Sequence, residues 1–496
     1  MFYINHRLLL RKQIICIALV AISDILFYKH PIGWTAGLYT GLIFAILIIS
    51  NRQLLAARQS KLIAFCITTL IIGLIESPSL LAIVMSIFGL MSLIILQKRK
   101  KTVSAVLWLN DICRFSEQTG WQWYKDFKSI LRIRKNNIRY GVSFRFAVLP
   151  LMLTIVFSSL FAEANPIIGR ILSLADFEFL NPFVSLFRWL YWLLAAMLLW
   201  GLLRPRFPLI DPKIAPDSID LERWLNPQNL ILSLMLFNGL FFIQNSLDVI
   251  FLWRNEALPL GLTYAEYAHS GFYPLLFINF LTAAFVLITF NESRKSLQTE
   301  SAKKMVYLWL GQNLFLTFSA INRLLHYIEA YSLTYLRIAA LAGMMLTAAG
   351  LFVIFLKIYN KYDNAWLIDA NTLVVIITLY STCFINTDRI IADYNVAHSK
   401  EVTGTGSNID LALLETLGSE SLPALHWFKQ NARYSPYKTQ QARLIITVLE
   451  AQLAQDRADW RAWTWRKQSQ WNETSAIESP ELINHHLPTA NNQWQY

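Results

Sequence analysis

The stretch GWTAGLYTGLIFAILIIS at residues 33–50, followed by NRQLLAARQSK at 51–61, contains the pattern that decides the fold. The first part has no charged residue and is about long enough to cross the hydrocarbon of a bilayer as a helix. The second part carries Arg52, Arg58 and Lys61. Similar apolar stretches recur from about Gln13 onward, and basic residues gather in every second gap between them. This alternation predicts a protein that crosses a membrane many times.

Composition indicates that the bilayer is the main solvent of the chain. Of the 496 residues, 55% are hydrophobic and only 15% are charged. Each crossing must be a helix, because an irregular backbone exposed to lipid would leave unpaired amides that cost several kcal/mol apiece. We therefore expect an all-α, polytopic transmembrane helical bundle with about eleven spans. The spans are predicted at residues 13–28, 33–50, 62–75, 79–96, 143–161, 184–203, 226–252, 272–290, 305–325, 335–357 and 365–385.

Lysine and arginine are distributed unevenly between the two sets of loops, and this asymmetry sets the orientation. The loops opposite the basic set offer little beyond Lys29, Arg170 and Arg254. The positive-inside rule places the N-terminus in the cytoplasm, and an odd number of spans then places the tail after Ile385 outside. The basic set consists of Arg7, Arg11, Lys12, Arg52, Arg58, Lys61, Lys98, Arg99, Lys100, Lys101, Arg132, Arg134, Lys135, Arg139, Arg204, Arg206, Arg294, Lys295, Lys303, Lys304, Lys357 and Lys361.

The net charge of +12 could indicate nucleic-acid binding. The basic residues, however, flank the apolar stretches and do not gather on one soluble unit, and no basic and aromatic module of the kind that binds nucleic acid is present. Their placement is typical of orientation signals and of contacts to anionic lipid. We therefore expect membrane lipids as partners and no nucleic acid.

Four parts follow from these patterns. Residues 1–103 form an N-terminal four-span helical region, and residues 141–385 form a seven-span core. Between them, residues 104–140 mix tryptophans with lysines and arginines. This composition favours helices lying in the inner lipid interface, and a solvated basic loop is the alternative. Residues 386–496 form a soluble helical tail, which the orientation places in the periplasm or outside the cell.

Helical spacing predicts the elements of the tail. Helices are expected at Leu411 to Leu417 and at Leu444 to Leu453, and the run from Asp459 to Trp465 is expected to close the second of them. The tryptophans of this run are predicted to form the core of a small domain, with a belt resting on the membrane as the alternative. Gly404 to Ser407 and the stretch after Glu473 are predicted loops. Such a tail could bind an envelope protein.

Small residues recur every four positions in the second predicted span, at Gly33, Gly37, Gly41 and Ala45. This spacing lets two helix backbones approach closely, which favours helix association in lipid. The neighbouring helix can belong to the same chain, and that packing is our first expectation. A homodimer through Gly33, Gly37 and Gly41 is the alternative.

The sequence contains no recognisable catalytic, nucleotide-binding or metal-binding motif. The four cysteines, Cys16, Cys66, Cys113 and Cys383, include no CxxC pair, so neither a disulfide framework nor a zinc site is expected. There is also no P-loop, HExxH, GxSxG or Rossmann glycine pattern. We therefore predict no metal and no cofactor, and we lean away from an enzyme.

Polar residues gather at the ends of spans on the predicted outer side. In the ninth span, Asn322, His326 and Glu329 share one helical face with Arg323 beside it. Arginine near a span end needs a partner or must reach the interface, and Asp248, Glu266 and Glu329 are acids that could pair with Arg323 and Arg337. Such a cluster could bind an anionic headgroup, relay protons or hold an acid–base pair, or it could be a structural network. The candidate binding residues are Asp248, Tyr264, Glu266, His269, Asn322, Arg323, His326, Glu329 and Arg337.

Several of these outward segments resemble a known group of proteins, the bacterial multi-pass inner-membrane family known only by a domain-of-unknown-function label. The resemblance spans about residues 140–430 and implies a location in the bacterial cytoplasmic (inner) membrane. It implies no established activity and no catalytic residues. The matching stretches are FAEANPIIGR (161–170), LLRPRFP (202–208), LTYAEYAHSGFYPL (262–275), SAINRLLHYIEAYSLTYLR (319–337) and NTDRIIADYNVAH (386–398).

Three functions remain open at this point. The first is a sensing, scaffolding or regulatory membrane component that presents its tail to a partner or to the envelope. The second is transport of a small anion or amphiphile, which the outward polar cluster would serve. The third is an enzyme acting on lipid-linked or envelope substrates, with Glu266, His269, His326 or Glu329 as acids or bases and Arg323 and Arg337 binding phosphate. Of these we expect the first.

Overall fold

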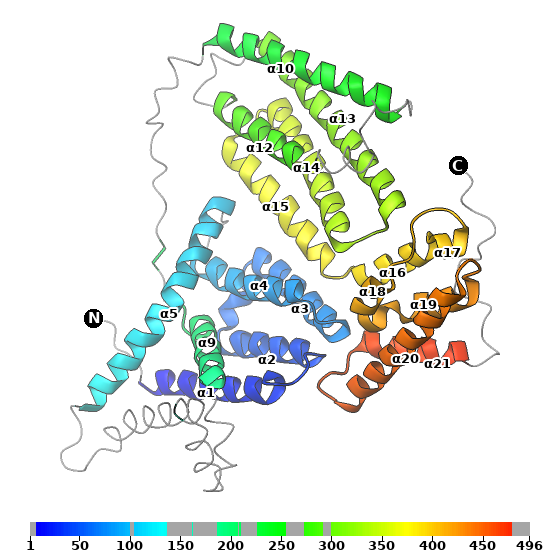
Figure 1. Cartoon of the computed structure of the whole chain (residues 1–496). Helices are drawn as coiled ribbons and strands as arrows, with labels where there is room; N and C mark the ends of the chain where they lie inside the picture. The colour runs from blue at the N-terminus through cyan, green and yellow to red at the C-terminus, as the bar shows by residue number, and fades with distance from the viewer. Residues whose placement is uncertain are drawn as a thin grey trace. The chain divides into compact units, whose positions relative to one another are not determined.

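The computed structural model describes residues 6–99, 104–135, 161, 186–206, 208–209, 226–253, 272–290 and 299–478. Within these residues every regular element is a helix, which confirms the predicted all-α class. The chain divides into two compact units, each described by itself. Figure 1 labels the helices and colours them in chain order. The first unit comprises residues 1–103 and 107–212, and the second comprises residues 104–106 and 213–496.

The first unit is a bundle of apolar helices with one long amphipathic helix. That helix, α5, belongs to this unit from Leu107 onward and buries Asp111, Ile112 and Phe115 on one side. It runs without a break through most of the predicted interfacial segment, so the loop alternative for residues 105–135 is wrong. The helices are α1 (His6–Phe27), α2 (Thr35–Ser50), α3 (Arg58–Glu76), α4 (Leu80–Arg99), α5 (Ala105–Lys135) and α9 (Leu186–Leu203), with a 3₁₀ turn η1 (Arg52–Leu55).

Helices α1 and α9 run antiparallel. At the start of α1, the Lys12 ammonium donates to the carbonyl of Leu203 over 2.7 Å, at the end of α9. At the far end of α1, Asp24 binds Arg188, near the start of α9. Two helices that the prediction places as spans of opposite direction therefore pack in opposite directions.

The small residues of α2 face α3 within the chain. A Cβ atom added at Gly37 would lie 2.5 Å from a side-chain carbon of Ile75 and 2.8 Å from the Ile71 carbonyl oxygen. At Gly41 the nearest atom, again of Ile71, is 3.6 Å away. The four-residue spacing thus serves close packing inside the first unit. A homodimer through the same glycines stays a prediction.

The second unit contains the longest helix, α13, which has 32 residues. Asn226 and Thr299 cap α10 and α13 by accepting hydrogen bonds from backbone amides in the first turns, as such residues do at helix starts. The apolar helices are α10 (Pro227–Asp248), its continuation η4 in π geometry (Val249–Trp253), α12 (Phe272–Thr289), α13 (Glu300–Tyr331), α14 (Tyr335–Asn360) and α15 (Asn364–Thr382). The tail contributes α16 (Thr387–Ala397), α17 (Lys400–Thr403), α18 (Leu411–Thr416), the 3₁₀ turn η6 (Gly418–Ser421), α19 (Leu422–Asn431), α20 (Pro436–Ala458) and α21 (Trp465–Glu478).

Contacts give the direction of α10 and α12 relative to α13. The Asn238 amide on α10 donates to the carbonyl of Met305. Seven residues further along both helices, Asn245 donates to the carbonyl of Gln312, so α10 and α13 run parallel. On α12, by contrast, Thr282 contacts Asn313 while the later Phe285 packs on the earlier Trp309. Helix α12 therefore runs antiparallel to α13.

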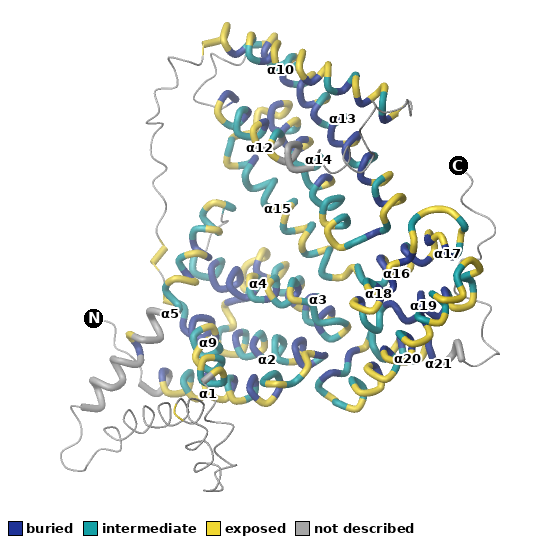
Figure 2. Tube along the Cα trace, in the orientation of Figure 1, coloured by how far each residue is buried: buried dark blue, intermediate teal, exposed yellow. Residues whose placement is uncertain are grey.

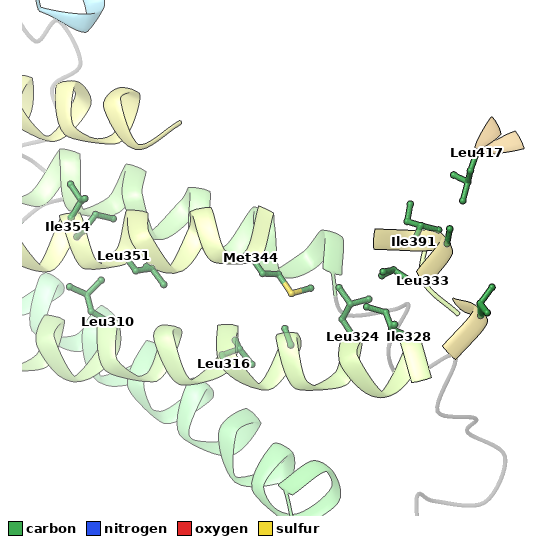
Figure 3. Close-up of a cluster of buried hydrophobic side chains, with 14 of the residues drawn as sticks. Leu310, Leu316, Leu324, Ile328, Leu333, Met344, Leu351, Ile354, Ile391 and Leu417 are labelled. Atoms are coloured by element: carbon green, nitrogen blue, oxygen red, sulfur yellow. The ribbon is translucent and has the colours of Figure 1, made fainter. Parts of the chain in front are cut away.

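The hydrophobic core of the second unit extends from the apolar helices into the tail. Figure 3 shows Leu310, Leu316, Leu324 and Ile328 of α13 facing Met344, Leu351 and Ile354 of α14. At the end of α13 the same cluster continues through Leu333 to Ile391 of α16 and to Leu417. The tail therefore shares a core with the helices that precede it.

A helix occupies every predicted span that lies within the described residues, whereas nearly all of 143–161 lies outside them. Five described helices are long and apolar enough to cross a membrane, consistent with a membrane protein: α3, α4, α10 with η4, α14 and α15. Many of their exposed positions are large apolar residues, which suit contact with lipid tails. Figure 2 shows exposed positions along α10, and the large apolar residues exposed on this helix include Leu232, Leu236, Leu240, Ile243 and Leu247.

The tail differs from its prediction around the tryptophan run. Helix α20 ends at Ala458, and the run lies in the turn before α21 and at its first residue, so it does not close α20. The predicted core role is wrong for Trp460 and Trp465, which are 51% and 68% exposed. The predicted loop after Glu473 is helical up to Glu478, because α21 continues through it.

Substituting Gly37 by Ala tests the packing of α2 on α3. The added methyl group meets backbone and cannot be accommodated without movement, so we expect a loss of about 1–3 kcal/mol. Gly239→Ala is the matched control, because a Cβ at this helical position meets nothing within 4 Å. Thermal unfolding in detergent should show a lower midpoint for Gly37→Ala and an unchanged or slightly higher one for Gly239→Ala. Equal midpoints would contradict the packing.

Candidate functional site

Asp248 and Arg323 form a buried ion pair between α10 and α13. Asp248 is fully buried and Arg323 is 8% exposed. One Asp248 oxygen accepts hydrogen bonds from the Arg323 guanidinium and, over 3.1 Å, from the Gln244 amide. Asp248 is also the last residue of α10 before the chain changes to π geometry, a local distortion that is frequent at functional sites. Asp248 is one of the acids predicted to pair with Arg323, and this pairing is confirmed.

Other residues of the predicted outer cluster that the structure describes lie elsewhere on α13. His326 and Glu329 contact each other over 3.3 Å on the exposed side of α13, with side chains 45% and 66% exposed. Asn322 is half-buried on the same helix. Tyr264, Glu266 and His269 lie outside the described residues.

Arg337 binds backbone carbonyls at the end of α13. Its guanidinium donates to the carbonyl of Tyr331 over 2.6 Å and to that of Ser332, and it lies 4.4 Å from the ring centre of Tyr327. It thereby satisfies free carbonyls at the end of α13, where a cation also suits the helix dipole. Among the described residues of the predicted cluster, the contacts thus form a buried pair, an exposed pair and a helix cap.

A contact that the sequence did not reveal joins the α13–α14 turn to α16. The buried Asn395 side chain accepts from the backbone amide of Leu333 over 2.6 Å and donates to its carbonyl over 2.9 Å. We call this the Leu333 clamp. Beside it, the Tyr335 hydroxyl donates to Asp388 over 2.6 Å. Two of the stretches that resemble the bacterial family, 319–337 and 386–398, therefore meet at this point.

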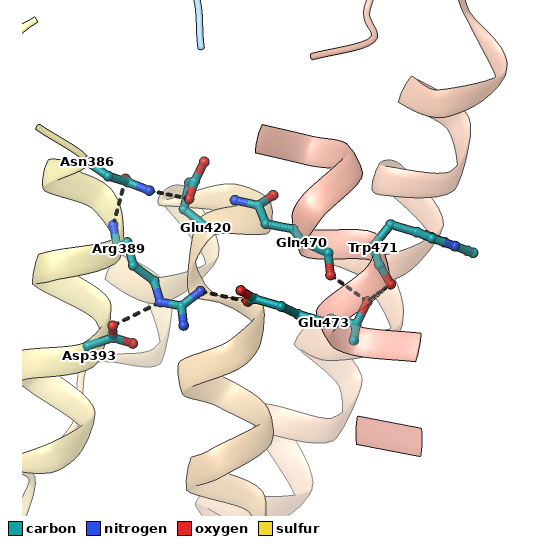
Figure 4. Close-up of polar contacts among 8 residues, drawn as sticks. Asn386, Arg389, Asp393, Glu420, Gln470, Trp471 and Glu473 are labelled. Carbon is teal, nitrogen blue, oxygen red and sulfur yellow. Dashed lines mark hydrogen bonds and ion pairs between the residues drawn. The ribbon is translucent and has the colours of Figure 1, made fainter. Parts of the chain in front are cut away.

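Polar contacts also hold α16 to the rest of the tail. Figure 4 shows Arg389 donating to Asp393 on its own helix over 2.9 Å and to Glu473 of α21 over 3.1 Å. Next to it, Asn386 caps α16 and donates to Glu420 of η6 over 2.7 Å. The first helix of the tail is thus fixed on both sides, to the α13–α14 turn and to α21.

Glu401 organises the loop between α17 and α18. It is 4% exposed, binds the Lys438 ammonium over 2.8 Å and accepts from the backbone amide of Ile409 over 2.9 Å. Burial alone would raise the pKa of Glu401, but the bonds from Lys438 and Ile409 outweigh it, and the pKa lies below its ordinary value.

Three further buried Asp–Arg pairs lie among the described residues of the first unit. Arg188 donates to Asp24 over 2.9 Å, Arg99 to Asp111 over 2.9 Å, and Arg204 lies 2.8 Å from Asp126. The sequence pattern predicts that Arg99 and Arg204 are loop charges, yet both contact acids of α5. Asp111 and Asp126 are fifteen residues apart and so lie on one side of this helix, a spacing that could have pointed to the pairing.

A buried lysine is the last unexpected group. Lys357 is 2% exposed, although the sequence analysis counted it among the inner loop charges. Its ammonium donates to the carbonyl of Phe290 over 2.9 Å and to the Asn364 side chain. Among the described residues, no group of three or more His, Cys, Asp or Glu side chains could hold a metal ion.

Comparison with known families gives the identification. The family described as a domain of unknown function, DUF4153, matches residues 14–427. The chain belongs to the DUF4153 family. No curated protein and no solved structure shows significant similarity to it.

The DUF4153 match confirms the predicted resemblance and extends it. The resemblance began at about residue 140, whereas the match begins at residue 14 and so includes α2, α3 and α4 as well. It ends within α19, so α20 and α21 lie beyond the DUF4153 region. The Leu333 clamp and all four buried Asp–Arg pairs lie inside it.

Replacing Asp248 by Ala should be strongly destabilising, because the Arg323 guanidinium would stay buried without this carboxylate. Breaking a buried pair costs about 3–5 kcal/mol. Glu329→Ala is the control, since an exposed pair contributes at most about 1 kcal/mol. Thermal unfolding in detergent should show a large fall in the midpoint for Asp248→Ala and almost none for Glu329→Ala. A similar fall in the unfolding midpoint for both variants would show that the buried Asp248 pair contributes no more stability than the exposed pair.

Glu401 should make the tail acid-sensitive. Because its folded pKa is depressed, its stabilisation is present above the ordinary glutamate pKa of about 4.3 and is lost as the pH falls through the folded value. We expect Glu401→Gln to lower the unfolding midpoint at pH 7 and to flatten its decline below pH 5. Glu415→Gln, which changes an exposed glutamate of α18, should leave both unchanged. An unaltered pH profile in Glu401→Gln would contradict the assignment.

Proposed function

We propose that this DUF4153 chain is a multi-pass protein of the bacterial inner membrane, with about eleven spans, a cytoplasmic N-terminus and the tail outside. The directions of the helices support this topology. Helices α10 and α13 correspond to the seventh and ninth predicted spans and run parallel, as two odd-numbered spans must. Helix α12, the eighth, runs against α13, and α1 runs against α9, the sixth.

Within this topology, the chain acts as a sensing, scaffolding or regulatory component whose working surface is the tail. The Leu333 clamp carries this proposal. Asn395 satisfies both backbone groups of Leu333, so α16 is fixed to the turn that joins two helices of the apolar bundle. A partner of the tail, such as an envelope protein, would then act on a part that is tied to the membrane helices.

Transport of a small anion or amphiphile is the second candidate, and one observation favours it. Polar contacts between α10 and α13 recur at Asn238, Asn245 and Asp248. The contacting residues of α10 extend over about 15 Å of the helix. This is about half the thickness of the hydrocarbon, so the contacts form a polar row within the apolar bundle.

The tail proposal predicts that Asn395→Ala impairs function without removing the protein. The substitution leaves the amide and carbonyl of Leu333 without these partners, which costs about 1–3 kcal/mol per buried group. In a strain lacking the gene, we expect Asn395→Ala to complement poorly at normal protein level. Asn431→Ala is the control, because the Asn431 amide bonds only within α19 in the described contacts.

Two outcomes would contradict the proposal. Full complementation by Asn395→Ala and by a chain truncated after Asp388 would show that the tail is dispensable. A reporter fused at Tyr496 that is active only in the cytoplasm would reverse the orientation. If instead Asn245→Leu abolishes complementation while the truncated chain retains it, the transport candidate is favoured.

A further inference from the structure

Two cations that follow α9 contact one carboxylate of α5 in the first unit, and a third cation from α1 lies close to them. Arg204 lies 2.8 Å from Asp126, and Arg206 lies 3.7 Å from the other oxygen of the same carboxylate. Lys12 approaches from α1, where its ammonium donates to the carbonyl of Leu203, the residue before Arg204. We call Lys12, Arg204 and Arg206 the Lys12 cluster.

Close helix packing holds the cluster together. A Cβ atom at Gly201 of α9 would lie 2.4 Å from a side-chain carbon of Thr119 on α5, so the two backbones approach tightly there. Trp200 next to it donates to Asp126 over 3.2 Å. Asp126 thus accepts a hydrogen bond from Trp200 and forms an ion pair with Arg204, and together these contacts hold Arg204 in position.

The cations of the cluster act on one another. Burial lowers the pKa of Lys12, and the positive charges of Arg204 and Arg206 lower it further. Burial also lowers the pKa of Arg204, and Asp126 only partly offsets the combined effect of burial and Arg206. The three cations therefore repel one another. An anion bound beside them would relieve this repulsion.

The cluster lies where a lipid headgroup would be. Lys12 immediately precedes the first predicted span, and Arg204 immediately follows the sixth, so both mark the same end of the hydrocarbon. On the side toward the hydrocarbon, the same helices expose large apolar residues that could contact acyl chains: Ile14 and Ile17 on α1, and Leu194 and Leu198 on α9. Basic pockets between membrane helices on the cytoplasmic side are typical sites for anionic headgroups.

We propose that Lys12, Arg204 and Arg206 bind the phosphate group of an anionic phospholipid. Arginine offers paired N–H donors to phosphate oxygens, and Arg206, which is 51% exposed, is the cation most accessible to lipid. Assigning the lipid to the inner leaflet rests on the proposed topology, whereas binding itself does not. Full complementation by Asn395→Ala and by the truncated chain would therefore not contradict lipid binding at this site.

Lipid binding to the purified full-length protein tests the site. The delipidated protein in neutral detergent is titrated with phosphatidylglycerol, and bound lipid is counted by native mass spectrometry. Lys12→Gln and Arg206→Gln should each weaken binding about tenfold. Arg11→Gln is the matched control, because it removes one charge from an exposed neighbour on the same helix and should change affinity less than twofold. Unchanged unfolding midpoints would show that the variants remain folded.

Two further measurements distinguish a lipid headgroup from free phosphate as the ligand. Phosphatidylcholine should bind at least tenfold more weakly than phosphatidylglycerol, and inorganic phosphate at millimolar concentration should not displace the lipid. Equal losses in Arg11→Gln, Lys12→Gln and Arg206→Gln would overturn the site in favour of diffuse attraction to a basic surface. Full displacement by inorganic phosphate would overturn the lipid as its ligand.

Discussion

A charged group on an apolar helix must have a partner, and this constraint shapes both units. Burying a lone charge costs several kcal/mol, which a membrane helix cannot offset locally. Among the described residues the solution is the same four times, an aspartate on one helix and an arginine on another. The pairs Asp24–Arg188, Asp111–Arg99, Asp126–Arg204 and Asp248–Arg323 each join two helices. These ion pairs make the contacts between helices specific, because the surrounding apolar surfaces could pack in several ways.

The same constraint changes the meaning of the basic residues. Arg99, Arg204 and Lys357 were counted as signals in loops, yet each is largely buried and bonded. They still lie at helix ends, so their side of the membrane, and hence the predicted orientation, is unaffected. Their role is different, because a cation at a helix end can pair with a carboxylate or donate hydrogen bonds to free carbonyls of a neighbouring helix.

The helices could be predicted from the sequence because apolar length and periodicity are local properties. The pairing of Asp248 with Arg323 could be predicted because both partners are charged and lie near the ends of two spans that run in the same direction. The Leu333 clamp left no such signal, since Asn395 bonds to backbone and any residue at position 333 offers the same groups. The tryptophan run was misjudged because ring size suggests a core, whereas the turn between α20 and α21 leaves Trp460 and Trp465 exposed.

Helix α13 connects the buried Asp248–Arg323 pair to the tail. Arg323 and Leu333 are ten residues apart, so a movement of α16 either breaks the clamp or pulls on the helix that carries the buried pair. The two clamp bonds contribute about 1–3 kcal/mol together, and burial of Leu333 adds about 1.5–3 kcal/mol. This is comparable to the 3–5 kcal/mol, roughly, that protects a buried ion pair. Neither the clamp nor the ion pair is clearly weaker than the other. A displacement of the tail would therefore also move α13. This coupling favours a regulatory role over a role in which the tail only binds a partner.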